Sequence, residues 1–225
     1  IRRSRAVMRQ LAELGLPLAT EALNPLVMSY LDDLISWTAI GARTAESQTH
    51  REMVSHLPMP VGIKNSTDGS AANAVNAMIA ARHSHHTLGV DADGRLVMLD
   101  TPGNPDTHLV LRGGRGITNY DADSIAAALT TLQQGDCVSR VLVDCSHDNA
   151  CKQHDRQPAI AREVVAQRVA GNNGILGLML ESFITAGRQN DGAELTYGQS
   201  ITDACIGWDE TERLLVELHA MLAGA

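Results

Sequence analysis

The chain has 225 residues, of which 44% are hydrophobic and 20% are charged, enough to bury a sizeable core. Its formal net charge of −8 argues against nucleic acid as a partner, because binding to a phosphate backbone requires a basic face. No apolar stretch reaches the roughly 20 residues of a membrane helix, so we expect no membrane segment. The four cysteines form no CxxC pair, and we expect reduced thiols in a cytoplasmic protein.

The predicted elements alternate between helices and short apolar strands. Helices are expected over 2–14, 26–36, 46–56, 70–82, 122–133, 157–170 and 209–223. Strands are expected over 17–21, 38–43, 60–64, 107–112, 140–146 and 174–181. Residues 86–101 are predicted to form an inserted hairpin, because the apolar runs TLGV and RLVML flank the turn-rich DADG. A long loop is expected over 183–207. This order is typical of a parallel sheet that is covered on both faces.

Each of the six apolar runs ends on a polar residue. These residues are Glu21, Arg43, Lys64, Arg112, His147 and Glu181. In a (β/α)₈ barrel, the carboxyl ends of the strands form the active rim. The alternative is that charges only mark where solvent begins. Three cations and three side chains of the acid or metal-ligand type favour the rim, so we predict an α/β fold of the (β/α)₈ barrel class.

The number of predicted strands falls short of a closed barrel. Eight strands in about 250 residues are typical, whereas six are predicted here. A six-stranded sheet would leave two edges with unpaired backbone groups. We therefore expect a TIM barrel that lacks its first two strands, with residues 1–225 forming a single domain.

Arg43, Lys64 and Arg112 are candidates for an anion site. Arginine forks bind carboxylates and phosphates through two hydrogen bonds, and a lysine adds a point charge. Each residue alone could equally form a surface salt bridge. Together, at three strand ends of an acidic chain, they favour a site for a small anionic substrate.

His147, Glu181 and Asp203 are the candidate metal ligands. One imidazole and two carboxylates suit a divalent ion such as Mn²⁺, Fe²⁺, Co²⁺ or Zn²⁺. We interpret Cys145 as a core residue and give Cys205 no ligand role. The group of His83, His85 and His86 is interpreted as a solvated turn rather than a second metal cluster.

Seven motifs, in order along the chain, resemble a known family. They are GLPLATEALNP, DLISWTAIGARTAESQTHREM, PVGIKNSTDG, HLVLRGG, VDCSHDNACK, GLMLESF and YGQSITDACIGW. Together they resemble the class I (type Iα) 3-deoxy-D-arabino-heptulosonate 7-phosphate (DAHP) synthases from residue 15 to residue 208. The resemblance implies an aldolase-type TIM barrel that opens the shikimate pathway to aromatic amino acids. It also implies a homo-oligomer, either a dimer or a tetramer.

The resemblance implies a reaction between phosphoenolpyruvate and D-erythrose 4-phosphate at one divalent metal ion. Carbon 3 of phosphoenolpyruvate attacks the aldehyde, water adds at carbon 2, and phosphate leaves. The resemblance further implies that Arg43, Lys64 and Arg112 hold phosphoenolpyruvate, helped by the Ala42 amide, with Glu21 facing the same pocket. The expected catalytic residues are Lys64, His147 and Glu21, and the expected metal ligands are His147, Glu181 and Asp203.

The chain also departs from the family pattern. The family's cysteine ligand and its Lys-Pro-Arg-Thr segment have no counterpart here, so we expect a truncated chain that is a weak catalyst. Asn24, Ser66 and Ala150 replace the aspartate, glycine and serine that are usual in three of the motifs. Two alternatives remain open. One is the sister reaction on an arabinose phosphate, and the other is a non-catalytic remnant that binds phosphoenolpyruvate or a partner chain.

Overall fold

The computed structural model describes residues 1–91, 93–192 and 194–224 and has an α/β fold. Six strands form one sheet in the order β1-β2-β3-β6-β7-β8, and β1 with β2, β2 with β3, and β7 with β8 pair in parallel. The strands are β1 Ala19–Glu21, β2 Trp37–Ile40, β3 Val61–Lys64, β6 Thr107–Leu111, β7 Val141–Asp144 and β8 Ile175–Met179. All six predicted strands are therefore confirmed, with ends that differ by a few residues.

Helices separate the strands along the chain. They are α1 Arg2–Glu13, α2 Pro25–Met28, α3 Gln48–His56, α4 Ala72–Ala81, α5 Ala122–Gln134, α6 Gln157–Val169 and α7 Trp208–Ala223. Two short 3₁₀ helices, η1 Asp32–Leu34 and η2 His154–Arg156, complete the helical elements of the described residues. None of the helices in the described part of the chain combines the length and apolar character that crossing a bilayer requires.

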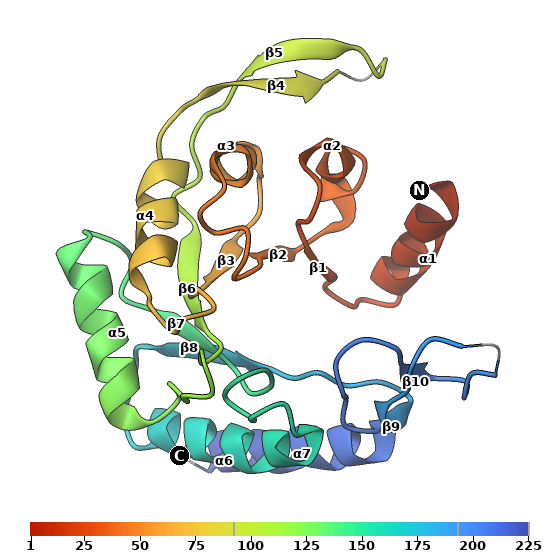
Figure 1. Ribbon diagram of the computed structural model, residues 1–225, viewed down its shortest axis with the longest axis vertical. Helices are drawn as coiled ribbons and strands as arrows, with labels where there is room; N and C mark the ends of the chain where they lie inside the picture. Colours follow the sequence, from red (N-terminus) through yellow and green to blue (C-terminus); the bar gives the residue numbers. More distant parts are fainter. Residues whose placement is uncertain (92, 193, 225) are drawn as a thin grey trace. The chain divides into compact units, whose positions relative to one another are not determined.

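The chain divides into two compact units. Unit 1 comprises Ile1–Ser66, Ala71–Leu109 and Thr131–Val138, and unit 2 comprises Thr67–Ser70, Val110–Thr130 and Ser139–Ala225. In unit 1, every residue of β3 is buried, and so is β2 after its first residue. Burial of successive residues means that both faces of these strands are covered, which explains why their sequences are continuous apolar runs. Helices α3 and α4 of unit 1 pack against each other (Figure 1).

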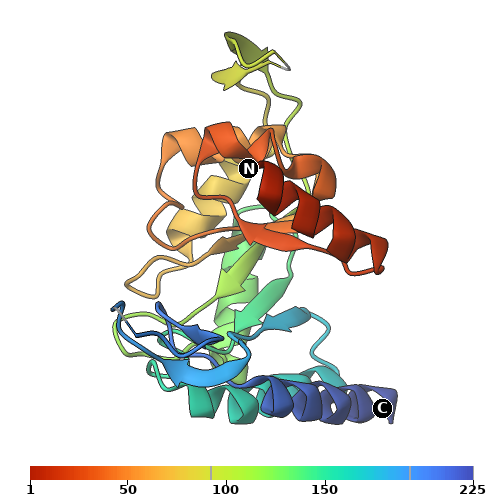
Figure 2. The same ribbon diagram turned by 90° about the vertical axis from the view of Figure 1, so that its right-hand side faces the viewer.

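The inserted hairpin is confirmed. Strands β4 His86–Val90 and β5 Leu96–Asp100 pair in antiparallel fashion and extend away from α3 and α4 of the same unit (Figures 1 and 2). Gly89 faces Leu99 so closely that a Cβ at position 89 would lie 2.0 Å from Leu99 Cδ1. The Leu99 side chain thus packs against the backbone at Gly89 and would have to move if residue 89 carried a side chain. Ala92, in the expected DADG turn, lies outside the described residues.

In unit 2, helices α6 and α7 lie side by side (Figure 1). Val143 of β7, Val164 of α6 and Leu214 of α7 are almost completely buried, so the apolar faces of these elements form its core. The prediction of an unstructured loop over 183–207 is wrong in part. Two short parallel strands, β9 Thr185–Arg188 and β10 Gln199–Ser200, form within it.

The predicted helix over 26–36 is also wrong. The side chain of Asn24 accepts a hydrogen bond from the Leu26 amide and caps α2, and Pro25 occupies its first turn, but the helix ends at Met28. The Tyr30 carbonyl instead accepts a hydrogen bond from Arg5, which also forms an ion pair with Asp33.

Candidate metal centre and anion-binding residues

The turn after β7 positions His147. The strand ends at Asp144, and His147 follows three residues later with a backbone φ of 50°. Residues with a side chain rarely adopt this left-handed conformation, and such strain persists where the surrounding structure holds it in place. Asp144 is fully buried, and its Oδ2 lies 2.8 Å from His147 Nδ1. The other ring nitrogen, Nε2, is thereby turned toward Glu181 and Asp203.

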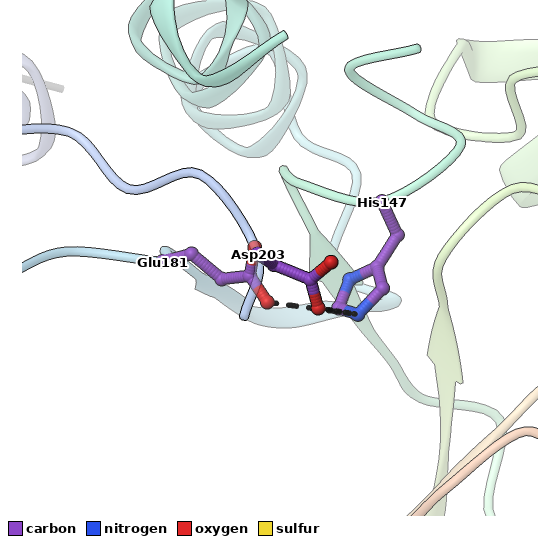
Figure 3. Close-up of side chains that lie close together, drawn as sticks. All are labelled: His147, Glu181 and Asp203. Atoms are coloured by element: carbon purple, nitrogen blue, oxygen red, sulfur yellow. Dashed lines mark ion pairs between the residues drawn. The ribbon is translucent and has the colours of Figure 1, made fainter. Parts of the chain in front are cut away.

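His147, Glu181 and Asp203 come together within unit 2 (Figure 3). Glu181 follows the end of β8, and Asp203 lies in the segment after β10. His147 Nε2 is 3.6 Å from Glu181 Oε1 and 3.9 Å from Asp203 Oδ2. One ligand atom from each residue lies within 4.8 Å of the other two. The structure therefore brings together the three residues that the sequence selected as metal ligands.

The electrostatics of this cluster suit a cation. Burial raises the pKa of the Glu181 carboxyl, and the charges of Asp203 and Asp144 raise it further, while the Ser146 hydroxyl and the His147 ring oppose the rise. Three carboxylates around one imidazole leave an excess of negative charge that a divalent ion would offset. Nitrogen and oxygen donors in this ratio are a normal set for Mn²⁺, Fe²⁺, Co²⁺ or Zn²⁺. The residues present fit a divalent metal ion.

Cys145 and Cys205, which lie two residues from His147 and Asp203 in the sequence, do not belong to the cluster. Cys145 is fully buried, and burial raises the pKa of its thiol, which confirms the interpretation of Cys145 as a core residue. The Cys205 thiol donates a hydrogen bond to the Asp203 carbonyl at 3.5 Å. Among the described residues, the histidines at 83, 85 and 86 form no metal cluster. His85 Nε2 lies 2.9 Å from the Ala80 carbonyl, and His86 pairs with Asp100.

Arg112, directly after β6, is buried in unit 2. Its Nη1 donates to Asp148 Oδ2 at 3.0 Å, a pair that the sequence analysis missed. The sequence offered one indication of the Arg112–Asp148 pair, which is that Asp148 directly follows His147 in the VDCSHDNACK motif. Gly113, at a φ of 70°, lies so near Asn149 that a Cβ at position 113 would be 2.8 Å from the backbone nitrogen of Asn149. Gly113 thus allows close packing of two backbone segments.

The remaining candidate residues lie in unit 1. Lys64 is the last residue of β3 and is buried, whereas Arg43 is exposed in the turn that follows β2. Glu21, the last residue of β1, extends over the same turn, because a Cβ on Gly41 would lie only 2.3 Å from Glu21 Oε1. Unit 1 therefore brings Glu21 next to the turn that carries Ala42 and Arg43.

Two of the departures from the family motifs have a structural role. Asn24 caps α2, as described above, and its side-chain oxygen accepts the hydrogen bond from the Leu26 amide that an aspartate carboxylate could also accept. Ser66 accepts a hydrogen bond from Asn73 Nδ2 at 3.0 Å, and the same nitrogen donates to Glu46 at 2.6 Å. Ala150 is fully buried, and nothing in the structure explains its replacement of a serine.

Comparisons with known proteins show which family the chain resembles. The model of the DAHP synthetase I family matches residues 4–216. The Tyr-sensitive phospho-2-dehydro-3-deoxyheptonate aldolase of Escherichia coli K12 is 50% identical over 98% of this chain and 63% of its own length. The Trp-sensitive enzyme of the same strain is 48% identical over 96% of this chain and 62% of its own length.

Among solved structures, the phospho-2-dehydro-3-deoxyheptonate aldolase from Francisella tularensis SCHU S4 superimposes with a TM-score of 0.91 at 38% identity. The match covers 95% of this chain and 63% of that structure. The chain thus spans less than two thirds of the length of these relatives. On the extent of the family match and the identity to its members, the chain belongs to the DAHP synthetase I family.

Proposed function

We propose that this protein acts as a DAHP synthase, which condenses phosphoenolpyruvate with D-erythrose 4-phosphate and water to give DAHP and phosphate. The observation that carries the proposal is the cluster of His147, Glu181 and Asp203 in a chain of this family. The relatives are named as phospho-2-dehydro-3-deoxyheptonate aldolases, and the sequence motifs for the reaction lie in the part of the chain that they share.

The finer description of the fold is part of the proposal. One sheet of six strands with intervening helices, in which β1–β2, β2–β3 and β7–β8 pair in parallel, fits a (β/α)₈ TIM barrel to which residues 1–225 contribute six strands and the inserted hairpin. We propose that the two compact units are parts of one such domain. The superposition with a larger member of the family supports this, because it covers almost all of this chain but 63% of that structure.

His147, Glu181 and Asp203 would hold one divalent ion, with Mn²⁺, Fe²⁺, Co²⁺ and Zn²⁺ as the candidates. A bound ion of this type supplies a Lewis acid that can polarise the aldehyde oxygen of the sugar phosphate. Nε2 of His147 and the Oε1 side of Glu181 are the donor groups that face each other, and their separation of 3.6 Å suits a shared ion.

The cationic residues would bind phosphoenolpyruvate. Arg43, Lys64 and Arg112 stand at or just beyond the carboxyl ends of strands, and we propose that they bind its phosphate and carboxylate groups. The Ala42 amide and Glu21 would complete this part of the site. Holding the enol phosphate in one orientation against the aldehyde lowers the entropic part of the barrier. The aldehyde oxygen must gain a proton and the attacking water must lose one, and we assign these transfers to Lys64 and Glu21, while His147 acts as a ligand of the ion.

The test is release of inorganic phosphate that depends on both phosphoenolpyruvate and erythrose 4-phosphate, measured with Mn²⁺ or Co²⁺ present. His147→Ala should reduce release by about 10²–10⁴-fold, the usual scale for loss of a positioned catalytic group. His83→Ala, an exposed histidine in a turn, is the matched control and should change little.

Three outcomes would contradict the proposal. Equal release by the His147 and His83 variants would exclude the metal site from the reaction. Release with arabinose 5-phosphate in place of erythrose 4-phosphate would indicate the sister reaction. Binding of phosphoenolpyruvate without any release from either aldose would indicate a non-catalytic member of the family.

A further inference from the structure

Two side chains behind the metal cluster contact its ligands without belonging to it. Asp144 ends β7, and Ser146 lies between Asp144 and His147 in the short segment Asp-Cys-Ser-His. Both residues are buried, with 0% of Asp144 and 4% of Ser146 exposed. Each contacts a different proposed ligand, and neither was selected by the sequence analysis.

Asp144 contacts the ring of His147. Its Oδ1 accepts a hydrogen bond from the Ser146 amide at 2.9 Å, which fixes the plane of the carboxylate. Its Oδ2 then lies 2.8 Å from His147 Nδ1, an ion-pair separation without the alignment of a hydrogen bond, and both of these atoms are shielded from solvent. A carboxylate beside Nδ1 favours a proton on that nitrogen, so the lone pair of the neutral ring is on Nε2. Nε2 is the nitrogen that faces Glu181 and Asp203.

Ser146 contacts the carboxylate of Glu181. Its hydroxyl donates to Glu181 Oε2 at 2.5 Å, while the other oxygen, Oε1, is the one 3.6 Å from His147 Nε2. The backbone of Glu181 is fixed as well. Gln157, fully buried in the first turn of α6, accepts from the Glu181 amide at 2.7 Å and donates to its carbonyl at 3.0 Å. One carboxylate oxygen is therefore engaged and the other is presented to the cluster.

We propose that Asp144 and Ser146 are positioning residues for the metal site. Asp144 sets the His147 tautomer so that Nε2 is the donor atom, and Ser146 makes Glu181 a ligand through one oxygen. The inference rests on the proposed function, because it assumes that these ligands bind an ion. Side chains that orient metal ligands commonly contribute about 10–100-fold to metal affinity.

The role of Asp144 can be measured without any metal. In protein labelled with ¹⁵N at histidine, the imidazole shifts of His147 at a pH where the ring is neutral should report a proton on Nδ1. In Asp144→Asn, the amide oxygen can accept from Ser146 while the amide nitrogen faces the ring, so the proton should move to Nε2. An unchanged tautomer in the Asp144→Asn variant would overturn the assignment for this residue.

Metal affinity tests both residues. Titration of the wild-type chain with Co²⁺, followed by its visible absorption, gives the reference affinity and spectrum. Asp144→Asn and Ser146→Ala should each weaken Co²⁺ binding by about 10–100-fold, and Ser146→Ala should alter the spectrum because the second Glu181 oxygen is released. Ser146→Thr, which keeps the hydroxyl, should restore both. Cys145→Ala is the matched control. Cys145 is buried and stands between Asp144 and Ser146 in the sequence, but it does not belong to the metal cluster.

The outcomes separate this inference from the proposed function. A wild-type chain that fails to bind Co²⁺ would contradict the metal site itself, while the tautomer measurement would still test Asp144. If the wild type binds Co²⁺ and the Co²⁺ affinities of Ser146→Ala, Ser146→Thr and Cys145→Ala all lie within about twofold of the wild-type value, the role of Ser146 alone is contradicted. If Asp144→Asn does not fold, as judged by circular dichroism, the Ser146 variants decide the inference.

Discussion

At the scale of single residues, the three cationic side chains proposed to bind phosphoenolpyruvate differ sharply in their surroundings. Arg43 is exposed in a turn, whereas Lys64 and Arg112 are buried to more than nine tenths. Arg112 also forms an ion pair with Asp148, so its charge is partly offset before any ligand arrives. Replacing an exposed arginine removes its positive charge without leaving a buried partner unpaired. Arg43 is therefore the cleanest residue for testing the anion site.

Arg43→Ala should weaken the binding of phosphoenolpyruvate by about 1.5–3 kcal/mol, the usual contribution of a hydrogen bond to a charged group. Lys64→Met, which keeps most of the buried aliphatic chain, should weaken it by a similar amount. Isothermal titration calorimetry measures both. Arg140→Ala is the control, because Arg140 is an exposed arginine that precedes β7 and thus lies at the opposite end of a strand. Unchanged affinity in both the Arg43 and Lys64 variants would contradict the anion site.

His108 is the residue whose protonation should most affect stability. Burial lowers the pKa of its imidazole from 6.5 to about 4, and its Nε2 accepts a hydrogen bond from Trp37 Nε1 at 3.1 Å. Between these two pKa values the unfolded chain binds a proton that the folded chain does not. The contribution of His108 to stability is therefore complete above pH 6.5 and is lost as the pH falls toward 4. At about 1.4 kcal/mol per pKa unit, the loss amounts to about 3 kcal/mol.

The measurement is the free energy of unfolding in urea at several pH values from 4 to 7.5. His108→Gln keeps an acceptor for Trp37 but cannot take up a proton, so its stability should fall less steeply below pH 6.5 than that of the wild type. His83→Gln, which removes an exposed histidine, is the control and should follow the wild type. Identical slopes for the wild type and His108→Gln would show that His108 titrates normally in the folded protein.

At the scale of elements, continuous apolar runs predicted the central strands well because both faces of β3 and β6 are buried. The helix expected over 26–36 ends at Met28, and the hydrogen bond from Arg5 to the Tyr30 carbonyl joins residues 25 positions apart, which no local pattern reveals. The metal ligands could be selected because one imidazole and two carboxylates form a normal donor set for a divalent ion. Asp144 and Ser146 could not, since an acid and a serine inside a strand end look ordinary until Asp144 is found 2.8 Å from a ligand nitrogen.

At the scale of the whole molecule, β8 is the last strand in the sheet order of the described residues. Beside it, α6, β8 and α7 line an apolar hollow of about 340 Å³. Leu176, Leu215 and Leu222 border this hollow and are each about half exposed, at 47%, 48% and 49%. Covering the exposed half of such a side chain contributes roughly 1 kcal/mol. The predicted homo-oligomer remains a prediction, and this surface offers one way to test it.

We expect the chain to associate with itself in a concentration-dependent manner, and sedimentation velocity over a range of protein concentrations measures this directly. Leu176→Lys should shift the distribution toward the monomer, because a charge in the hollow must be desolvated when the surface is covered. Leu96→Lys is the control, since Leu96 is 67% exposed on the β4–β5 hairpin of the other unit. Loss of association in the Leu96 variant alone would show that the chains contact each other through the β4–β5 hairpin instead. A monomer at every concentration would show that the apolar surface beside β8 is too small to hold two chains together.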